Sequence, residues 1–169
     1  MLKQHPIRHP DLPRQLFAES KHHVYAVLDG ASNPALIDHL YDGERPEFAC
    51  LFRGELEPDM AECAPYLVRL EEGAPFTHWV IDHCLGKHWG IFALSKADFP
   101  ELLRHLRKHN MVYDGDSNQP GYFRYYDPRV LRAFLPTCDA ENLADLFGPV
   151  EAFFAEAEDG ASHIRFERT

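Results

Sequence analysis

The stretch HVYAVLDGA, residues 23–31, is the part of the chain that most directly indicates a fold. Residues 24–28 form a short apolar run with branched side chains, and Asp29-Gly30 supplies a turn directly after it. A short apolar run that ends in turn residues is typical of a buried β-strand. Residues 32–41 then predict a helix, because a Ser-Asn pair can cap its first turn and an apolar face follows.

The same alternation of strand and helix patterns continues toward residue 150. We expect strands at residues 48–55, 65–73 and 89–95, helices at residues 75–85, 98–110, 128–135 and 140–147, and two short strands around a polar turn within residues 111–128. Asp98 and Glu101 have the spacing of a capping box at the start of one helix. Strands that alternate with helices favour an α/β layer sandwich. The predicted fold is therefore a mixed, partly parallel sheet with helices packed on it, an antiparallel edge from residues 113–125, and a short helical C-terminal part.

The length of 169 residues fits a single domain. Hydrophobic residues make up 45% of the chain and aromatic residues 12%, which is typical of a globular protein. We expect an N-terminal docking arm or frayed end at residues 1–23, an α/β domain at residues 24–150, and a C-terminal helix or tail at residues 151–169.

Charge and hydropathy argue against several classes of function. The formal net charge of −10 argues against nucleic-acid binding, which draws on clustered Lys and Arg. Residues 1–17 lack the apolar core of a signal peptide, and no apolar run is long enough for a membrane span. We therefore expect a soluble, cytoplasmic protein that contacts neither nucleic acid nor a membrane. The four cysteines show no CxxC pair and are expected to be free thiols in a reducing compartment.

The sequence contains no strong signal for a metal, a cofactor or a catalytic centre. The densest histidine group is HWVIDHCLGKHW, residues 78–89, but His78 and His83 would lie about 140° apart around a helix and would not converge on a metal. His105 and His109 share a helix face that is better explained as solvated surface. No GxSxG, GxxxxGK[ST] or GxGxxG motif is present. We expect no metal, no cofactor and no enzymatic activity.

The stretch YFRYYDPRVLRAFLP, residues 122–136, is the most informative for function. Asp127-Pro128 predicts a helix start, because the carboxylate can accept free backbone amides and Pro lacks one. Arg124 lies within an aromatic run, and buried charges are paired. We expect Arg124 to form a largely buried bidentate ion pair with Asp29 or Asp127. Arg129, in the first turn, is expected to meet a partner carboxylate or a tertiary contact.

A series of blocks in the chain resembles a known family. The blocks are YAVLDGA (25–31), APYLVRL (64–70), HWGIFALS (88–95), LLRHLRKH (102–109), YFRYYDPRVLRAFL (122–135) and LFGPV (146–150). Together they are similar to the adaptor-chaperones of type VI secretion effectors, first catalogued as a domain of unknown function, over about residues 24–150. The structural signature of the resemblance consists of Asp29, Gly30, Pro65, Tyr66, Trp89, Gly90, Arg124, Asp127 and Pro128.

The resemblance implies a non-catalytic role in the bacterial cytoplasm. Members of this family bind a toxic effector and help load it onto the VgrG spike. Protein interfaces of this kind depend on a few aromatic or Arg anchors. The residues expected to contact a partner are Tyr122, Tyr125, Tyr126 and Arg129, with core packing as the alternative for at least half of the tyrosines, and a second apolar pair at Phe153 and Phe154.

A second hypothesis is a small α/β enzyme, a hydrolase or transferase, with an unrecognised active site near Asp29. This hypothesis predicts a deep pocket at the C-terminal ends of parallel strands. A binding module would instead copurify with one large effector and turn over no small molecule. Asp29 buried against Arg124 would remove the best catalytic residue of the enzyme hypothesis.

Overall fold

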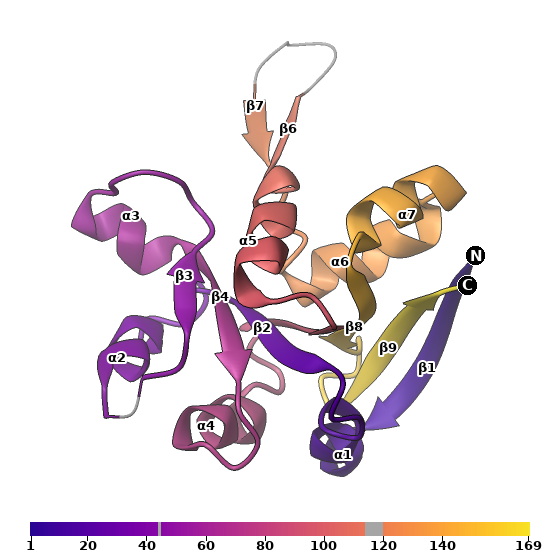
Figure 1. Cartoon of the computed structure of the whole chain (residues 1–169), viewed down its shortest axis with the longest axis horizontal. Helices are drawn as coiled ribbons and strands as arrows, with labels where there is room; N and C mark the ends of the chain where they lie inside the picture. The colour runs from indigo at the N-terminus through magenta and orange to yellow at the C-terminus, as the bar shows by residue number, and fades with distance from the viewer. Residues whose placement is uncertain (44, 114–119) are drawn as a thin grey trace.

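The structure is a computed structural model and describes residues 1–43, 45–113 and 120–169. Its centre is a seven-stranded sheet with the strand order β1-β9-β8-β5-β2-β4-β3 (Figure 1). The strands are β1 (Leu2–Arg8), β2 (His23–Asp29), β3 (Phe48–Cys50), β4 (Pro65–Leu70), β5 (Gly90–Ser95), β8 (Val150–Glu156) and β9 (Ser162–Arg168). Two further strands, β6 (Met111–Tyr113) and β7 (Pro120–Tyr122), form a separate two-stranded sheet.

All neighbouring strands of the large sheet are antiparallel, so the prediction of a partly parallel sheet is wrong. Strands β4 and β5 are joined by helix α4 (Pro75–His83) and point the same way, as in a parallel crossover. They are not neighbours, because β2 lies between them and runs opposite to both. The alternation of strands and helices was predicted correctly. The prediction missed that β2, which precedes both strands in the chain, lies between β4 and β5 in the sheet.

Helices cover both faces of the sheet, and the central strand β2 is buried between them. Its alternating side chains divide into two cores, with Val24, Ala26 and Leu28 on one face and Tyr25 and Val27 on the other. Below the sheet in Figure 1 lie α1 (Leu12–Leu16), α2 (Leu36–Tyr41) and α4, and above it lie α5 (Phe99–Lys108), α6 (Pro128–Phe134) and α7 (Ala140–Phe147). Burial on both faces explains why this strand is a continuous apolar run.

The remaining elements are short. Helix α3 (Pro58–Cys63) has no buried residue and follows the edge strand β3, while η1 (His9–Asp11) and η2 (Leu135–Thr137) are single 3-10 turns. The capping box at α5 is confirmed in part, since the Asp98 side chain accepts a hydrogen bond from the Glu101 amide at 3.0 Å. Within the described residues, every helix is too short or too polar to cross a membrane.

The two ends of the chain differ from their predictions. Residues 2–8, expected in a docking arm or frayed end, form edge strand β1, which pairs with β9, and α1 then buries Leu12 and Leu16. Residues 151–169, expected as a helix or tail, form the hairpin of β8 and β9. The predicted edge from residues 113–125 is wrong in its partner, because β6 and β7 pair only with each other. The polar turn expected between them, at residues 114–119, lies outside the described residues.

The C-terminal prediction failed for a physical reason. Strand β8 lies between β5 and β9, and its side chains alternate between the two cores, so residues 152–155 are apolar without a period of two. An apolar run of this length does not distinguish a buried strand from a helix. Phe153 and Phe154 point to opposite faces and are both fully buried.

Candidate functional site

The segment that follows β7 makes a tight turn into α6. Asp127 is the N-cap of α6, and its Oδ1 accepts a hydrogen bond from the Arg129 amide at 2.9 Å. The Arg129 guanidinium returns to the same carboxylate, with Nε 3.1 Å from Oδ1 and a terminal nitrogen 2.8 Å from Oδ2. The predicted helix start at Asp127-Pro128 is confirmed. Arg129 therefore pairs within its own turn, while its side chain stays 57% exposed.

Arg124 forms an ion pair with Asp29, as one of the two predicted pairings stated. The Asp29 side chain is 3% exposed and that of Arg124 is 46% exposed, so only the carboxylate is buried. The expectation of a largely buried, bidentate pair is wrong in two respects, because the arginine is about half exposed and the contact joins one guanidinium nitrogen to one carboxylate oxygen. The guanidinium also lies 5.8 Å from the centre of the Tyr126 ring, within the range of a cation–π contact. Arg124 thus joins the end of β2 to the turn before α6.

The other signature residues surround this pair where three strands meet. Pro65 at the start of β4 lies opposite Asp29, and Gly90 at the start of β5 lies opposite Leu28. The Asp29 amide donates to the Trp89 carbonyl at 2.8 Å. A Cβ atom at Gly90 would overlap the backbone oxygen of Val27, so only glycine fits there.

Two further members of the signature close the same corner. Gly30 donates its amide to the Ala64 carbonyl at 2.9 Å, and a Cβ at this position would overlap the Glu62 carbonyl. The Tyr66 hydroxyl donates to the Ala61 carbonyl at 2.6 Å, and burial raises the pKa of Tyr66 to about 12. The predicted structural signature therefore lies together at one corner of the fold, and its members hold backbone segments close to one another.

Both carboxylate oxygens of Asp29 have partners in this arrangement. Oδ1 accepts a hydrogen bond from the Ala31 amide at 3.0 Å, and Oδ2 pairs with Arg124. The described sheet also has no neighbouring parallel strands whose ends could form the pocket expected of an α/β enzyme. Asp29 is therefore a structural anchor, and the enzyme hypothesis has lost the residue on which it was based. In the described part of the chain, no three His, Cys, Asp or Glu side chains lie close enough to hold a metal ion.

Most of the predicted partner contacts are inside the protein. Tyr125 is fully buried and its hydroxyl donates to the Leu106 carbonyl at 3.0 Å, while Tyr126 is 4% exposed. Burial raises the pKa of Tyr126 to about 12. Phe153 and Phe154 belong to the two cores, so the expectation that they contact a partner is wrong in this structure. Core packing as the alternative for at least half of the tyrosines is confirmed, and Tyr122 is the exposed one at 57%.

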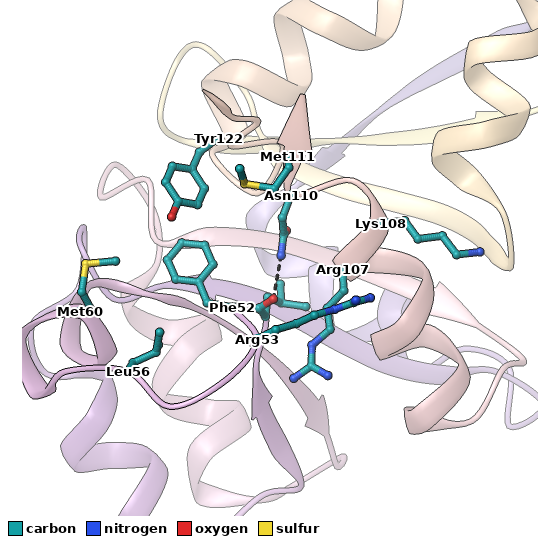
Figure 2. A pocket seen from close by; sticks show the side chains of 10 residues that line it. Phe52, Arg53, Leu56, Met60, Arg107, Lys108, Asn110, Met111 and Tyr122 are labelled. Carbon is teal, nitrogen blue, oxygen red and sulfur yellow. Dashed lines mark hydrogen bonds between the residues drawn. The ribbon is translucent and has the colours of Figure 1, made fainter. Parts of the chain in front are cut away.

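Tyr122 forms one wall of a surface groove that sequence reasoning missed. The groove has a volume of about 400 Å³ and lies between the loop after β3, the C-terminal end of α5 and strand β7 (Figure 2). We call it the α5 groove. It is lined on one side by Phe52, Leu56, Met60, Met111 and Tyr122, and on the other by Arg53, Arg107, Lys108 and Asn110. The Phe52 and Tyr122 rings pack with their centres 5.0 Å apart.

Asn110 holds the walls of the α5 groove together. Its side-chain Nδ2 donates to the Leu51 carbonyl at 2.8 Å, and its backbone carbonyl accepts from the Phe123 amide, also at 2.8 Å. Arg107 adds a third link, since its guanidinium donates to the Cys50 carbonyl at 2.8 Å. The two side-chain contacts join segments that are more than 50 residues apart in the chain. Such contacts leave no periodic signal, and the one available hint was an aromatic residue, Tyr122, outside any predicted apolar face.

Comparison with known proteins gives one match. A family model described as "Domain of unknown function (DUF4123)" matches residues 24–145, which contain the signature corner and the whole α5 groove. Strands β1, β8 and β9 lie outside the match. No curated protein and no solved structure matches the chain. Because the family model covers most of the sequence, the chain belongs to the DUF4123 family.

Proposed function

We propose that the protein is a non-catalytic adaptor and chaperone of type VI secretion. It binds a toxic effector in the bacterial cytoplasm and helps load that effector onto the VgrG spike. Two observations support this function: the resemblance of the sequence blocks to effector adaptor-chaperones, and the family match, which covers all of these blocks except LFGPV at residues 146–150. The partners in this proposal are the effector and the spike protein, and the protein itself transforms no small molecule.

The observation that carries the proposal is the α5 groove, which combines an exposed tyrosine with three cations inside the matched family region. Aromatic and Arg side chains are the residues that contribute most to protein interfaces. The groove stands on a rigid support, because Asn110 and Arg107 fix its walls through backbone carbonyls. A preformed surface loses little conformational entropy on binding, which favours a client complex that survives dilution.

The first test is copurification from cells that express the secretion system. The tagged protein is recovered from lysate, and its partners are identified by mass spectrometry. We expect an effector or a VgrG protein, and we expect its recovery to be lost when Tyr122→Asp places a charge in the groove. Tyr41→Asp is a matched control, because Tyr41 is 53% exposed and packs on Phe48 with ring centres 5.3 Å apart, as Tyr122 packs on Phe52.

The outcomes test the adaptor function and the role of the α5 groove separately. Recovery of neither an effector nor a spike protein, from cells shown to secrete by this system, would reject the adaptor function. Recovery that persists with Tyr122→Asp would keep the adaptor function and exclude the α5 groove as the contact. Loss with both tyrosine variants would point to a general loss of folding, which circular dichroism of the purified variants would detect.

A further inference from the structure

The α5 groove is divided into an apolar half and a cationic half. Figure 2 shows Tyr122, Phe52, Met60 and Leu56 on one side, and Arg107 and Lys108 on the other, with Asn110 between them. Tyr122, Met60 and Met111 are exposed at 57%, 44% and 43%. Methionine side chains adapt their shape to an apolar partner, and tyrosine offers a large, stiff contact surface.

The cationic half is an exception on this protein. Acidic residues outnumber basic residues by 27 to 17 in the chain, but among the described residues no Asp or Glu lines the α5 groove. Among the described residues, neither Arg53 nor Lys108 forms an ion pair. Arg107 donates to a backbone carbonyl, so its positive charge is not neutralised by a carboxylate there. Three cations with no acidic neighbour in the described part of the chain make this groove attractive to a carboxylate.

Asn110 supplies a second observation at the boundary between the two halves. It is 5% exposed, its Nδ2 is bound to the Leu51 carbonyl, and its Oδ1 has no hydrogen-bond partner among the described residues. Arg107 Nε is likewise buried without a partner in that part of the chain. Buried polar atoms in proteins are nearly always paired. A peptide backbone has both the amide donor and the carbonyl acceptor that these two atoms lack, and reaching them requires the side chains that cover them to shift, because both atoms are buried.

We propose that the α5 groove binds an extended client segment in which an aromatic or large aliphatic side chain lies next to one or more carboxylates. The apolar side chain packs against Tyr122 and the two methionines, and the carboxylates face Arg53, Arg107 and Lys108. The volume of about 400 Å³ suits a short segment rather than a folded domain. This inference rests on the proposed adaptor function and names the chemistry of the client at that site.

A peptide partner is favoured over a nucleic acid by the net charge of the chain and by the apolar half of the groove. The net charge of −10 repels a polyanion, whose binding increases with each additional cation along its path. In the apolar half, the side chains of Phe52, Leu56, Met60 and Met111 give a phosphodiester backbone no hydrogen-bond donor, and only the Tyr122 hydroxyl could donate one. A segment of alternating apolar and acidic side chains matches both halves at once.

The test uses a display library of random 12-residue peptides, panned on the full-length protein. We expect the enriched peptides to combine an aromatic or aliphatic residue with Asp or Glu. One enriched peptide, labelled with fluorescein, is then titrated by anisotropy with the variants. The double variant Arg53→Glu, Lys108→Glu should bind it at least about tenfold more weakly, with the loss largest at low salt. Arg104→Glu, an exposed cation on the same helix outside the groove, should change the affinity by less than about twofold.

Several results would overturn the inference. These are a library that enriches no sequence, enriched peptides that are neutral or basic, and equal affinity for the wild-type protein and the double variant. Tighter binding of a fluorescein-labelled oligothymidine than of the peptide would assign the cations to nucleic acid instead. The peptide measurement needs no effector, so the inference about the groove can fail while copurification still supports the adaptor function through another surface.

Discussion

Replacing Arg124 by alanine leaves the Asp29 carboxylate buried without its cation, and the cost can be worked out from the exposure of the pair. Exposed ion pairs contribute about 0.2–1 kcal/mol, and breaking a fully buried pair costs about 3–5 kcal/mol. The Asp29 side chain is 3% exposed and the Arg124 side chain is 46% exposed, so this pair lies between the two limits. We expect Arg124→Ala to lower the free energy of unfolding by about 2 kcal/mol. For a chain of this length, that loss lowers the melting temperature by about 4–8 °C.

The assay is urea denaturation together with differential scanning calorimetry, and two further variants make it specific. Arg14→Ala is the matched control, since its side chain is 74% exposed and pairs with the partly exposed Asp11. It should cost less than about 1 kcal/mol. Adding Asp29→Asn to Arg124→Ala should recover part of the stability, because the unpaired buried charge is then gone. An Arg124→Ala protein with an unchanged melting curve would refute the reasoning that this pair anchors the signature corner.

Two other predictions concern stability. Burial, and then the nearby imidazole of His9, lower the pKa of His163 to about 4 from the ordinary 6.5, against an opposing effect of Asp159. The unfolded chain therefore takes up a proton on His163 between pH 6.5 and 4 that the folded protein does not, and the free energy of unfolding falls by about 3 kcal/mol across that window. Urea denaturation of the wild type and of His163→Gln should show that pH-dependent difference, and parallel curves would contradict it. Gly90→Ala forces a methyl group into the Val27 carbonyl. It should lower the free energy of unfolding by about 3 kcal/mol or more, or prevent soluble expression. A normal melting curve would show that β2 and β5 can move apart without a loss of stability.

The elements that sequence predicted well are those whose signal is local. Strand β2 ends in its own turn, α5 begins at an Asp98 cap, and α6 begins at an Asp127 cap. Each of these signals depends on residues that are only a few positions apart in the sequence. The ion pair of Arg124 was also predictable, because a cation within an aromatic run needs a partner, although its partial exposure was not.

Features that depend on distant segments were not predictable. Strand β2 lies between β4 and β5 and is antiparallel to both. The sequence of a single strand does not indicate which strand is its neighbour. The α5 groove has the same origin, since Asn110 and Arg107 contact carbonyls more than 50 residues away. The prediction of a helix or tail at β8 was wrong for a third reason. Burial on both faces removes the alternation of apolar and polar residues that identifies a strand.

The pairing of β1 with β9 has a consequence for how the protein is made. Figure 1 shows the two ends of the chain side by side, and the Thr169 amide donates to the Met1 carbonyl at 2.9 Å. A ribosome releases β1 long before β9, so this edge of the sheet closes after every other strand of the sheet has been synthesised. Contacts between residues so distant in sequence form slowly. While it waits, β1 carries Lys3 and Pro6, which disfavour pairing with the strand edge of another chain.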